Sequence, residues 1–144
     1  MDSQIRIFLA DLTYNTVSLA TEVFPLNIGL IASYCNEKFG DKIEITLFKY
    51  IDELDNAISE NPPDILGLSN YCWNHKVGAE LFGMLKKINP SAVTVWGGPN
   101  FPLDMPSQHE FMKEYHQVDS YIPVEGEVGF ANIVERVLEC ESKE

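Results

Sequence analysis

The sequence has few basic residues and no long apolar run, and each shortage excludes a class of partner. Only 10 lysines and arginines stand against 22 aspartates and glutamates, so the net charge is −12. A chain this acidic is repelled by nucleic-acid phosphates and by anionic lipid surfaces. No apolar segment reaches the roughly 18 residues that a membrane-spanning helix needs. We therefore expect no nucleic-acid partner and no membrane partner.

Cysteine is also scarce, and its pattern predicts a cytoplasmic protein. Cys35, Cys72 and Cys140 are odd in number and widely spaced, which is not the pattern of a disulfide framework. Residues 1–4 are polar and lead directly into a strand-like segment, without the basic start and apolar stretch of a signal peptide. Reduced thiols and a cytoplasmic location are the expectation.

The length and composition predict one folded domain over residues 1–144. A chain of 144 residues is close to the commonest domain size and leaves no room for two ordinary domains. Hydrophobic residues make up 45% of the sequence and charged residues 22%, which is the composition of a packed protein rather than a disordered one.

Short apolar runs alternate with segments of helical period, and this alternation predicts the fold class. The predicted strands are 5–10, 43–48, 65–69, 92–96 and 120–122. The predicted helices are 25–39, 51–58, 77–88 and 130–138. We expect an α/β fold in three layers, with a doubly wound, five-stranded parallel sheet of flavodoxin-like order 2-1-3-4-5. The helix at 25–39 has little polar surface, so we expect it to be the most buried.

Ligands of open parallel sheets bind beyond the carboxyl ends of the strands, so function is sought in the loops there. The connection that follows the first strand is long, running from Asp11 through Leu12, Thr13 and Tyr14 to Pro25. Loops of this length within a compact domain are usually functional or mobile. An ordinary solvated connection is the alternative.

The loop after the third strand combines small polar residues with two large aromatic ones. Ser69 and Asn70 are followed by Tyr71 and Trp73. Large aromatic side chains in a loop are usually buried against something, here either a planar ligand or a neighbouring loop. Ser69 is a natural hydrogen-bond donor to a ligand, or else a cap for its own backbone.

Glycines follow the fourth strand, and acidic residues follow the fifth. Gly97 and Gly98, which precede Pro99, remove two β-carbons where the chain turns, so that a bulky group could approach the backbone closely. The alternative is a tight turn that needs positive φ. Glu125 and Gly126 lie at the start of the last helix, where the helix dipole stabilises a carboxylate, and capping alone could also explain the acid.

Several familiar motifs are missing. The sequence contains neither GxGxxG nor GxxxxGK[ST], so the usual dinucleotide and triphosphate sites are unsupported. Cys72 and His75 have metal-like spacing, but no second pair accompanies them, and we predict no metal site. No arrangement of catalytic residues stands out, and Cys35 lies in an apolar helical setting that makes a thiol inert.

Four segments in this order resemble a known family. They are Pro25-Leu26-Asn27-Ile28-Gly29-Leu30-Ile31-Ala32, Asp64-Ile65-Leu66-Gly67-Leu68-Ser69, Val95-Trp96-Gly97-Gly98-Pro99, and Val118-Asp119 followed by Glu125-Gly126-Glu127 and Phe130. Together they resemble the N-terminal cobalamin-binding domain of cobalamin-dependent radical SAM enzymes, over nearly the whole chain.

The resemblance implies a corrinoid held over the carboxyl edge of the sheet, with its nucleotide tail running between the strand ends. Ser69 would meet the tail, Gly97 and Gly98 would let it pass, and the segment from Leu12 to Tyr14 would lie under the corrin. With the loop residues singled out above, the predicted cobalamin-binding residues are Leu12, Thr13, Tyr14, Ser69, Asn70, Tyr71, Trp73, Gly97, Gly98, Pro99, Glu125 and Gly126.

Two departures from the family pattern limit what this chain can do. Many cobalamin-binding domains carry DxHxxG after the first strand, but here Thr13 stands where the cobalt-ligating histidine is needed, and no histidine precedes His75. The CxxxCxxC motif that holds the 4Fe-4S cluster of radical SAM enzymes is also absent. We therefore expect a binding module that is not catalytic alone. S-adenosylmethionine and the cluster would belong to a C-terminal radical SAM catalytic domain, its expected partner.

Three alternatives stay open. The first is a flavodoxin-like FMN-binding electron carrier, because residues 13–16 resemble the T-G-N-T phosphate loop, although Tyr14 replaces its glycine. The second is a domain of this fold that has lost its cofactor. The third, a phosphoryl-accepting receiver, is disfavoured because it needs paired acids after the first strand, where Asp11 stands alone.

Overall fold

The computed structural model describes residues 4–14 and 24–141, which form alternating strands and helices. The strands are β1 (Ile5–Thr13), β2 (Ile43–Tyr50), β3 (Ile65–Ser69), β4 (Val93–Gly97) and β5 (Ser120–Ile122). The helices are α1 (Leu26–Phe39), the short 3-10 turn η2 (Gly40–Lys42), α2 (Ile51–Glu60), α3 (His75–Ile88), α4 (Met105–Glu114) and α5 (Gly126–Glu141).

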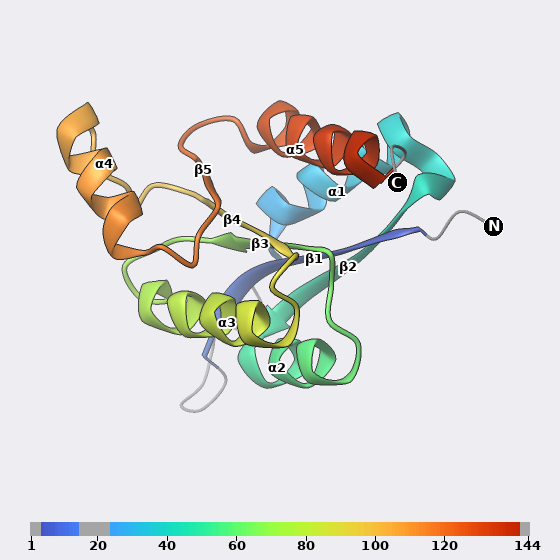
Figure 1. Ribbon diagram of the computed structural model, residues 1–144, viewed down its shortest axis with the longest axis horizontal. Helices are drawn as coiled ribbons and strands as arrows, with labels where there is room; N and C mark the ends of the chain where they lie inside the picture. The colour runs from blue at the N-terminus through green and yellow to red at the C-terminus, as the bar shows by residue number, and fades with distance from the viewer. Residues whose placement is uncertain (1–3, 15–23, 142–144) are drawn as a thin grey trace.

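The sheet has the predicted topology. All neighbouring strands are parallel, and their order is β2-β1-β3-β4-β5. Helices α1 and α5 cover one face and α2 and α3 cover the other, while α4 stands beyond the β5 edge (Figure 1). The three-layer flavodoxin-like fold expected from the sequence is confirmed.

The side chains of each strand alternate between two apolar cores. Leu66 and Leu68 of β3 and Trp96 of β4 belong to the core under α2 and α3. Ile65 of β3 and Val95 of β4 belong to the core under α1 and α5. This alternation follows from the two-residue period of a strand, and it places Gly67, Ser69 and Gly97 on the α1 and α5 face.

Two expectations drawn from the sequence are corrected. Strand β1 continues to Thr13 through an irregularity after Ala10, so Leu12 and Thr13 are strand residues and not loop residues. Helix α1 is not the most buried helix, since Leu26 is 61% exposed and Leu30 is 48% exposed. Its apolar residues lie on more than one side of the helix, and only one side contacts the sheet.

No helix within the described residues combines the length and the apolar character needed to cross a bilayer.

Candidate functional site

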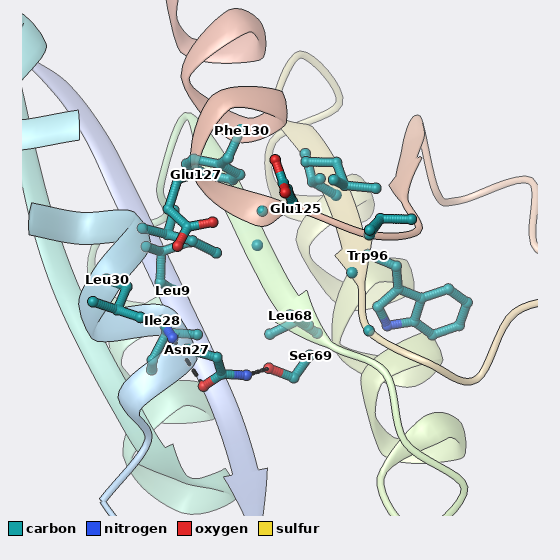
Figure 2. Close-up of a pocket in the computed structure, with 18 of the residues that line it drawn as sticks. Leu9, Asn27, Ile28, Leu30, Leu68, Ser69, Trp96, Glu125, Glu127 and Phe130 are labelled. Carbon is teal, nitrogen blue, oxygen red and sulfur yellow. Dashed lines mark hydrogen bonds between the residues drawn. The ribbon is translucent and has the colours of Figure 1, made fainter. Parts of the chain in front are cut away.

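A cavity of about 410 Å³ opens at the carboxyl edge of the sheet, between α1 and α5. The ends of β3 and β4 form its floor, and residues from β1, α1 and the start of α5 form its walls (Figure 2). This is the edge at which ligands of open parallel sheets bind. Its volume lies within the range of about 300–1,000 Å³ that is usual for small-molecule sites.

Small residues occupy the floor of the cavity. A β-carbon at Gly67 would lie 2.7 Å from Leu9 Cδ2 and 2.9 Å from the Phe130 ring, so this glycine lets the two apolar walls close over the sheet. At Gly97 a β-carbon would meet only the Ile122 carbonyl oxygen, at 3.5 Å, which is an ordinary contact. A side chain at Gly97 would therefore fit the protein and fill the cavity.

A small polar cluster lines the side of the cavity next to α1. Asn27 Nδ2 donates to Ser69 Oγ at 3.0 Å, and Asn27 Oδ1 accepts from the Ile28 amide at 2.8 Å (Figure 2). Burial raises the pKa of the adjoining Asp11 carboxyl, and hydrogen bonds from Asn27 and Ser69 partly offset that rise. The cluster therefore gathers a partly desolvated carboxylate and two neutral polar groups at the end of β1 and β3.

Acidic residues, and no basic ones, line the rest of the mouth. Glu125 and Glu127 flank the first residue of α5, where the helix dipole stabilises their charge, and both side chains lie over the cavity in Figure 2. No lysine, arginine or histidine is among the described residues that line the cavity. The site therefore favours neutral or cationic groups over multiply charged anions.

Two aromatic side chains stack beside the cavity. The rings of Tyr71 and Trp73 are 4.5 Å apart and nearly parallel, at 5°. Trp73 remains 56% exposed, and its carbonyl accepts a hydrogen bond of 3.0 Å from the Tyr14 hydroxyl. Burial, and then the charge of Asp11, raise the pKa of Tyr71. The pair is therefore packed within its own loop and still presents a flat aromatic surface outward.

Asn70 is fully buried and holds three loops together. Its Nδ2 donates to the Asn100 carbonyl at 2.9 Å and to the Tyr121 hydroxyl at 3.3 Å. Its Oδ1 lies 2.9 Å from His75 Nδ1 and accepts from Asn100 Nδ2 at 3.3 Å. The amide is thus engaged within the protein, at the point where β3, β4 and β5 end.

Gly98 meets a conformational need of the turn. Its φ is +110°, and a β-carbon there would lie 3.0 Å from the Asn70 carbonyl oxygen. The positive-φ turn that the sequence left as an alternative therefore applies to Gly98, whereas Gly97 has no such requirement. Pro99 is exposed and lies outside the lining of the cavity.

The structure brings together half of the predicted site residues around the cavity. Those that line it are Ser69, Tyr71, Gly97, Gly98, Glu125 and Gly126. Leu12, Thr13 and Trp73 line a neighbouring groove with Asp11 and Tyr71, and the Leu12 side chain is only 3% exposed. Asn70, Tyr14 and Pro99 line neither. Asn15 and Thr16, which belong to the predicted connection after the first strand, lie outside the described residues.

Sequence reasoning missed several residues that shape the cavity. They include Leu9, Asn27, Leu30, Val95, Ile122, Glu127 and Phe130. The strand period places Leu9 and Val95 on the same face as Gly97, so alternation could have found them. Asn27 and Leu30 were named only within the helical segment 25–32, because their exposure depends on where α1 begins relative to the sheet.

The described residues contain no cluster of three or more histidine, cysteine or acidic side chains able to hold a metal ion. His75, which the sequence paired with Cys72, instead packs against the Trp96 ring at 4.8 Å and against the Tyr115 ring at 4.7 Å. Its burial lowers its pKa.

The fold and the cavity define a doubly wound α/β domain of the flavodoxin-like class with a ligand-sized opening at the switch edge of its sheet. Solved structures with this fold include a cobalamin-binding protein from Desulfitobacterium hafniense DCB-2. It has a TM-score of 0.64 and 14% identity, and the match covers 92% of this chain and 58% of that one. The BeF3-activated DrrB receiver domain matches with a TM-score of 0.61 and 16% identity, over 95% of this chain and 99% of that one. At these identities the likeness concerns the fold alone.

Sequence comparison narrows the class. The chain is 29% identical over 116 residues to the cobalamin-dependent radical SAM methyltransferase TokK of Streptomyces tokunonensis, covering 76% of this chain and 16% of that protein. It is 28% identical over 127 residues to the 2-(S-pantetheinyl)-carbapenam-3-carboxylate methyltransferase of Streptantibioticus cattleyicolor, covering 83% of this chain and 18% of that protein. No family model matches the chain.

The predicted resemblance is confirmed, because this chain is a partial homologue of cobalamin-dependent radical SAM methyltransferases. The chain spans less than a fifth of the length of each of these two relatives.

Proposed function

We propose that this chain binds cobalamin as one module of a larger radical SAM methyltransferase. The observation that carries the proposal is the cavity at the carboxyl edge of the sheet, in a chain whose relatives include a cobalamin-dependent methyltransferase. A corrinoid is broad and flat and carries a nucleotide tail, so it needs an open edge next to a narrow cavity. The exposed rim and the small residues of the floor, Gly67, Ser69 and Gly97, meet both needs.

The residues present fit such a ligand. The tail would enter the cavity over Gly97, with Ser69 and Asn27 available as hydrogen-bonding partners at its mouth. Trp73 and Leu30, both about half exposed beside the opening, would cover apolar surface of the corrin. Asn70 and Gly98 would act by positioning the loops, because both are engaged within the protein.

The cobalt would be held without a histidine from this chain's β1 loop. His75 lies among aromatic side chains under Trp96, where it meets Asn70, and it does not line the cavity. Bound cobalamin would supply the methyl-transfer chemistry of its cobalt, while this chain would bind and orient the cofactor.

Residues 1–144 would form one domain whose partner is a radical SAM catalytic domain on its C-terminal side. The two relatives are more than five times longer than the matched region, which leaves room in them for such a domain. S-adenosylmethionine and the 4Fe-4S cluster would belong to that partner.

The acidic mouth argues against the FMN alternative. The phosphate of FMN is close to a dianion at neutral pH, and it would meet Glu125 and Glu127 in a cavity whose described lining has no basic residue. In cobalamin the single negative charge of the phosphodiester is balanced by the positive cobalt centre. The site is therefore better matched to a corrinoid than to a flavin phosphate.

The test is a titration of the chain with hydroxocobalamin and with FMN, in which binding is measured by visible absorption and by calorimetry. We expect hydroxocobalamin to bind and FMN not to bind. Gly97→Leu should abolish binding, because its side chain fills the floor of the cavity while the β-carbon meets only an ordinary contact.

Gly83→Leu is the matched control. Gly83 lies on α3, and a β-carbon there has open space around it, far from the cavity lining. This variant should bind hydroxocobalamin like the unchanged chain. Equal affinity of the Gly97→Leu protein would overturn the placement of the ligand, and FMN binding without cobalamin binding would favour the electron carrier.

A further inference from the structure

The inner wall of the cavity is apolar. Leu9, Val95 and Phe130, each 2% exposed, surround it together with Ile122. The Phe130 ring lies over Gly67, and Figure 2 shows it near Glu125 and Glu127 at the start of α5. A group that enters fully therefore exchanges water for hydrocarbon contacts.

The polar side chains of the lining are those of Asn27, Ser69, Tyr71, Glu125 and Glu127, while the Trp96 indole packs in the opposite core. Asn27 bonds both to Ser69 and to the backbone, and Ser69 also bonds to Asp11. Glu125 and Glu127 lie at the start of α5, one turn before Phe130. No side chain of the inner wall offers a donor or acceptor to a ring nitrogen.

We propose that this cavity selects among corrinoids by the base at the end of the nucleotide tail, favouring an alkylated benzimidazole over a purine. The inference rests on the proposed function, because it assumes that a corrinoid tail enters the cavity. Leu9, Val95, Ile122 and Phe130 would be the residues that set the preference.

The physical reason is the unequal cost of removing the two bases from water. A dimethylbenzimidazole that enters the cavity buries two methyl groups and a benzene ring. Burial of this apolar surface against an apolar wall strengthens its binding. A purine carries further ring nitrogens and, in adenine, an amino group, each of which loses hydrogen bonds to water without replacement. One such unsatisfied group weakens binding about tenfold or more.

The experiment titrates the 144-residue chain with three corrinoids. They are hydroxocobalamin, the analogue with an adenine base, and cobinamide, which lacks the nucleotide tail. We expect hydroxocobalamin to bind tightest, the adenine analogue at least about tenfold more weakly, and cobinamide more weakly than hydroxocobalamin.

The outcomes separate this inference from the proposed function. If no corrinoid binds, the proposed function fails and the inference fails with it. If all three bind equally, the chain binds corrinoids but the tail does not occupy the cavity. If the adenine analogue binds as tightly as hydroxocobalamin or more tightly, for example through its amino group to Glu127, the apolar selection is wrong.

A pair of conservative variants tests the role of the wall. Val95→Thr places a hydroxyl in the lining with little change of shape, and it should narrow the preference for the benzimidazole base severalfold. Val93→Thr is the control, because Val93 lies on the same face of β4 but outside the lining, and it should leave the preference unchanged. Thermal unfolding verifies that both variants are folded, and an unchanged preference in folded Val95→Thr would overturn the assignment.

Discussion

Three small residues on adjacent strands line the floor of the cavity. Gly67, Ser69 and Gly97 face the same side of the sheet, and two of them carry no β-carbon. The two glycines have different roles. Gly67 makes room for the side chains of Phe130 and Leu9, whereas Gly97 leaves space that no other part of the protein fills. Unused space at the ligand edge of the sheet is the residue-scale sign of a binding site.

The three cysteines differ in reactivity at the same scale. Cys35 is fully buried in α1, and burial raises its pKa to about 11, while Cys72 and Cys140 are exposed. Because the thiolate is the reactive form, a chromogenic thiol reagent at pH 8 should modify two thiols rapidly in the folded chain and the third only in denaturant. Cys35→Ser should leave the rapid phase at two thiols. Three equally fast thiols in the unchanged chain would contradict the burial of Cys35.

At the scale of elements, the ends of the strands are joined by one amide. Asn70 follows β3 and bonds to the loop after β4 and to Tyr121 of β5. The Tyr121 hydroxyl in turn donates to the Gly98 carbonyl at 2.8 Å, so the network fixes the turn that borders the cavity. The loops that frame the site are therefore held by long-range hydrogen bonds.

Removal of the Asn70 side-chain amide should destabilise the loops at the ends of β3, β4 and β5. Asn70→Ala leaves several buried partners unsatisfied, and we expect it to lower the free energy of unfolding by about 1–3 kcal/mol. Urea unfolding followed by circular dichroism measures the change. Asn56→Ala is the control, since Asn56 is exposed on α2 and should show no comparable loss. Equal stability of the two variants would show that the Asn70 network is not a structural brace.

At the scale of the whole molecule, charge repulsion opposes the compact state. The net charge is −12, and the four ion pairs found among the described residues join partly or largely exposed side chains. Exposed pairs contribute about 0–1 kcal/mol each. Repulsion among the excess carboxylates therefore outweighs these attractions at low salt.

Salt should accordingly stabilise the protein. Between 10 mM and 150 mM sodium chloride the screening length falls from about 30 Å to about 8 Å, which weakens repulsion over the whole surface. We expect the urea midpoint at pH 7 to rise over this range. As a control, the urea midpoint of a net-neutral flavodoxin-like domain measured in parallel should change less. If the midpoint of this chain falls as salt is added, the attraction within the ion pairs outweighs the repulsion among the carboxylates.

Local patterns in the sequence determined the fold class and the edge at which to look for a site. The period of the apolar residues and the glycine and proline positions are local properties, so the five strands and the parallel order could be predicted from them. The glycines at the end of β4 and the acidic residues at the start of α5 pointed to the edge where the cavity lies, for the same reason.

Tertiary structure alone decided which side chains meet at that edge. The engagement of Asn70 depends on Asn100 and Tyr121, which are 30 and 51 residues away in the chain. The exposure of Leu30 and the place of Phe130 depend on how α1 and α5 pack beside each other over the sheet. A side chain that is bonded or buried through distant partners leaves no local signal, because its free energy depends on contacts that form only when the chain has folded.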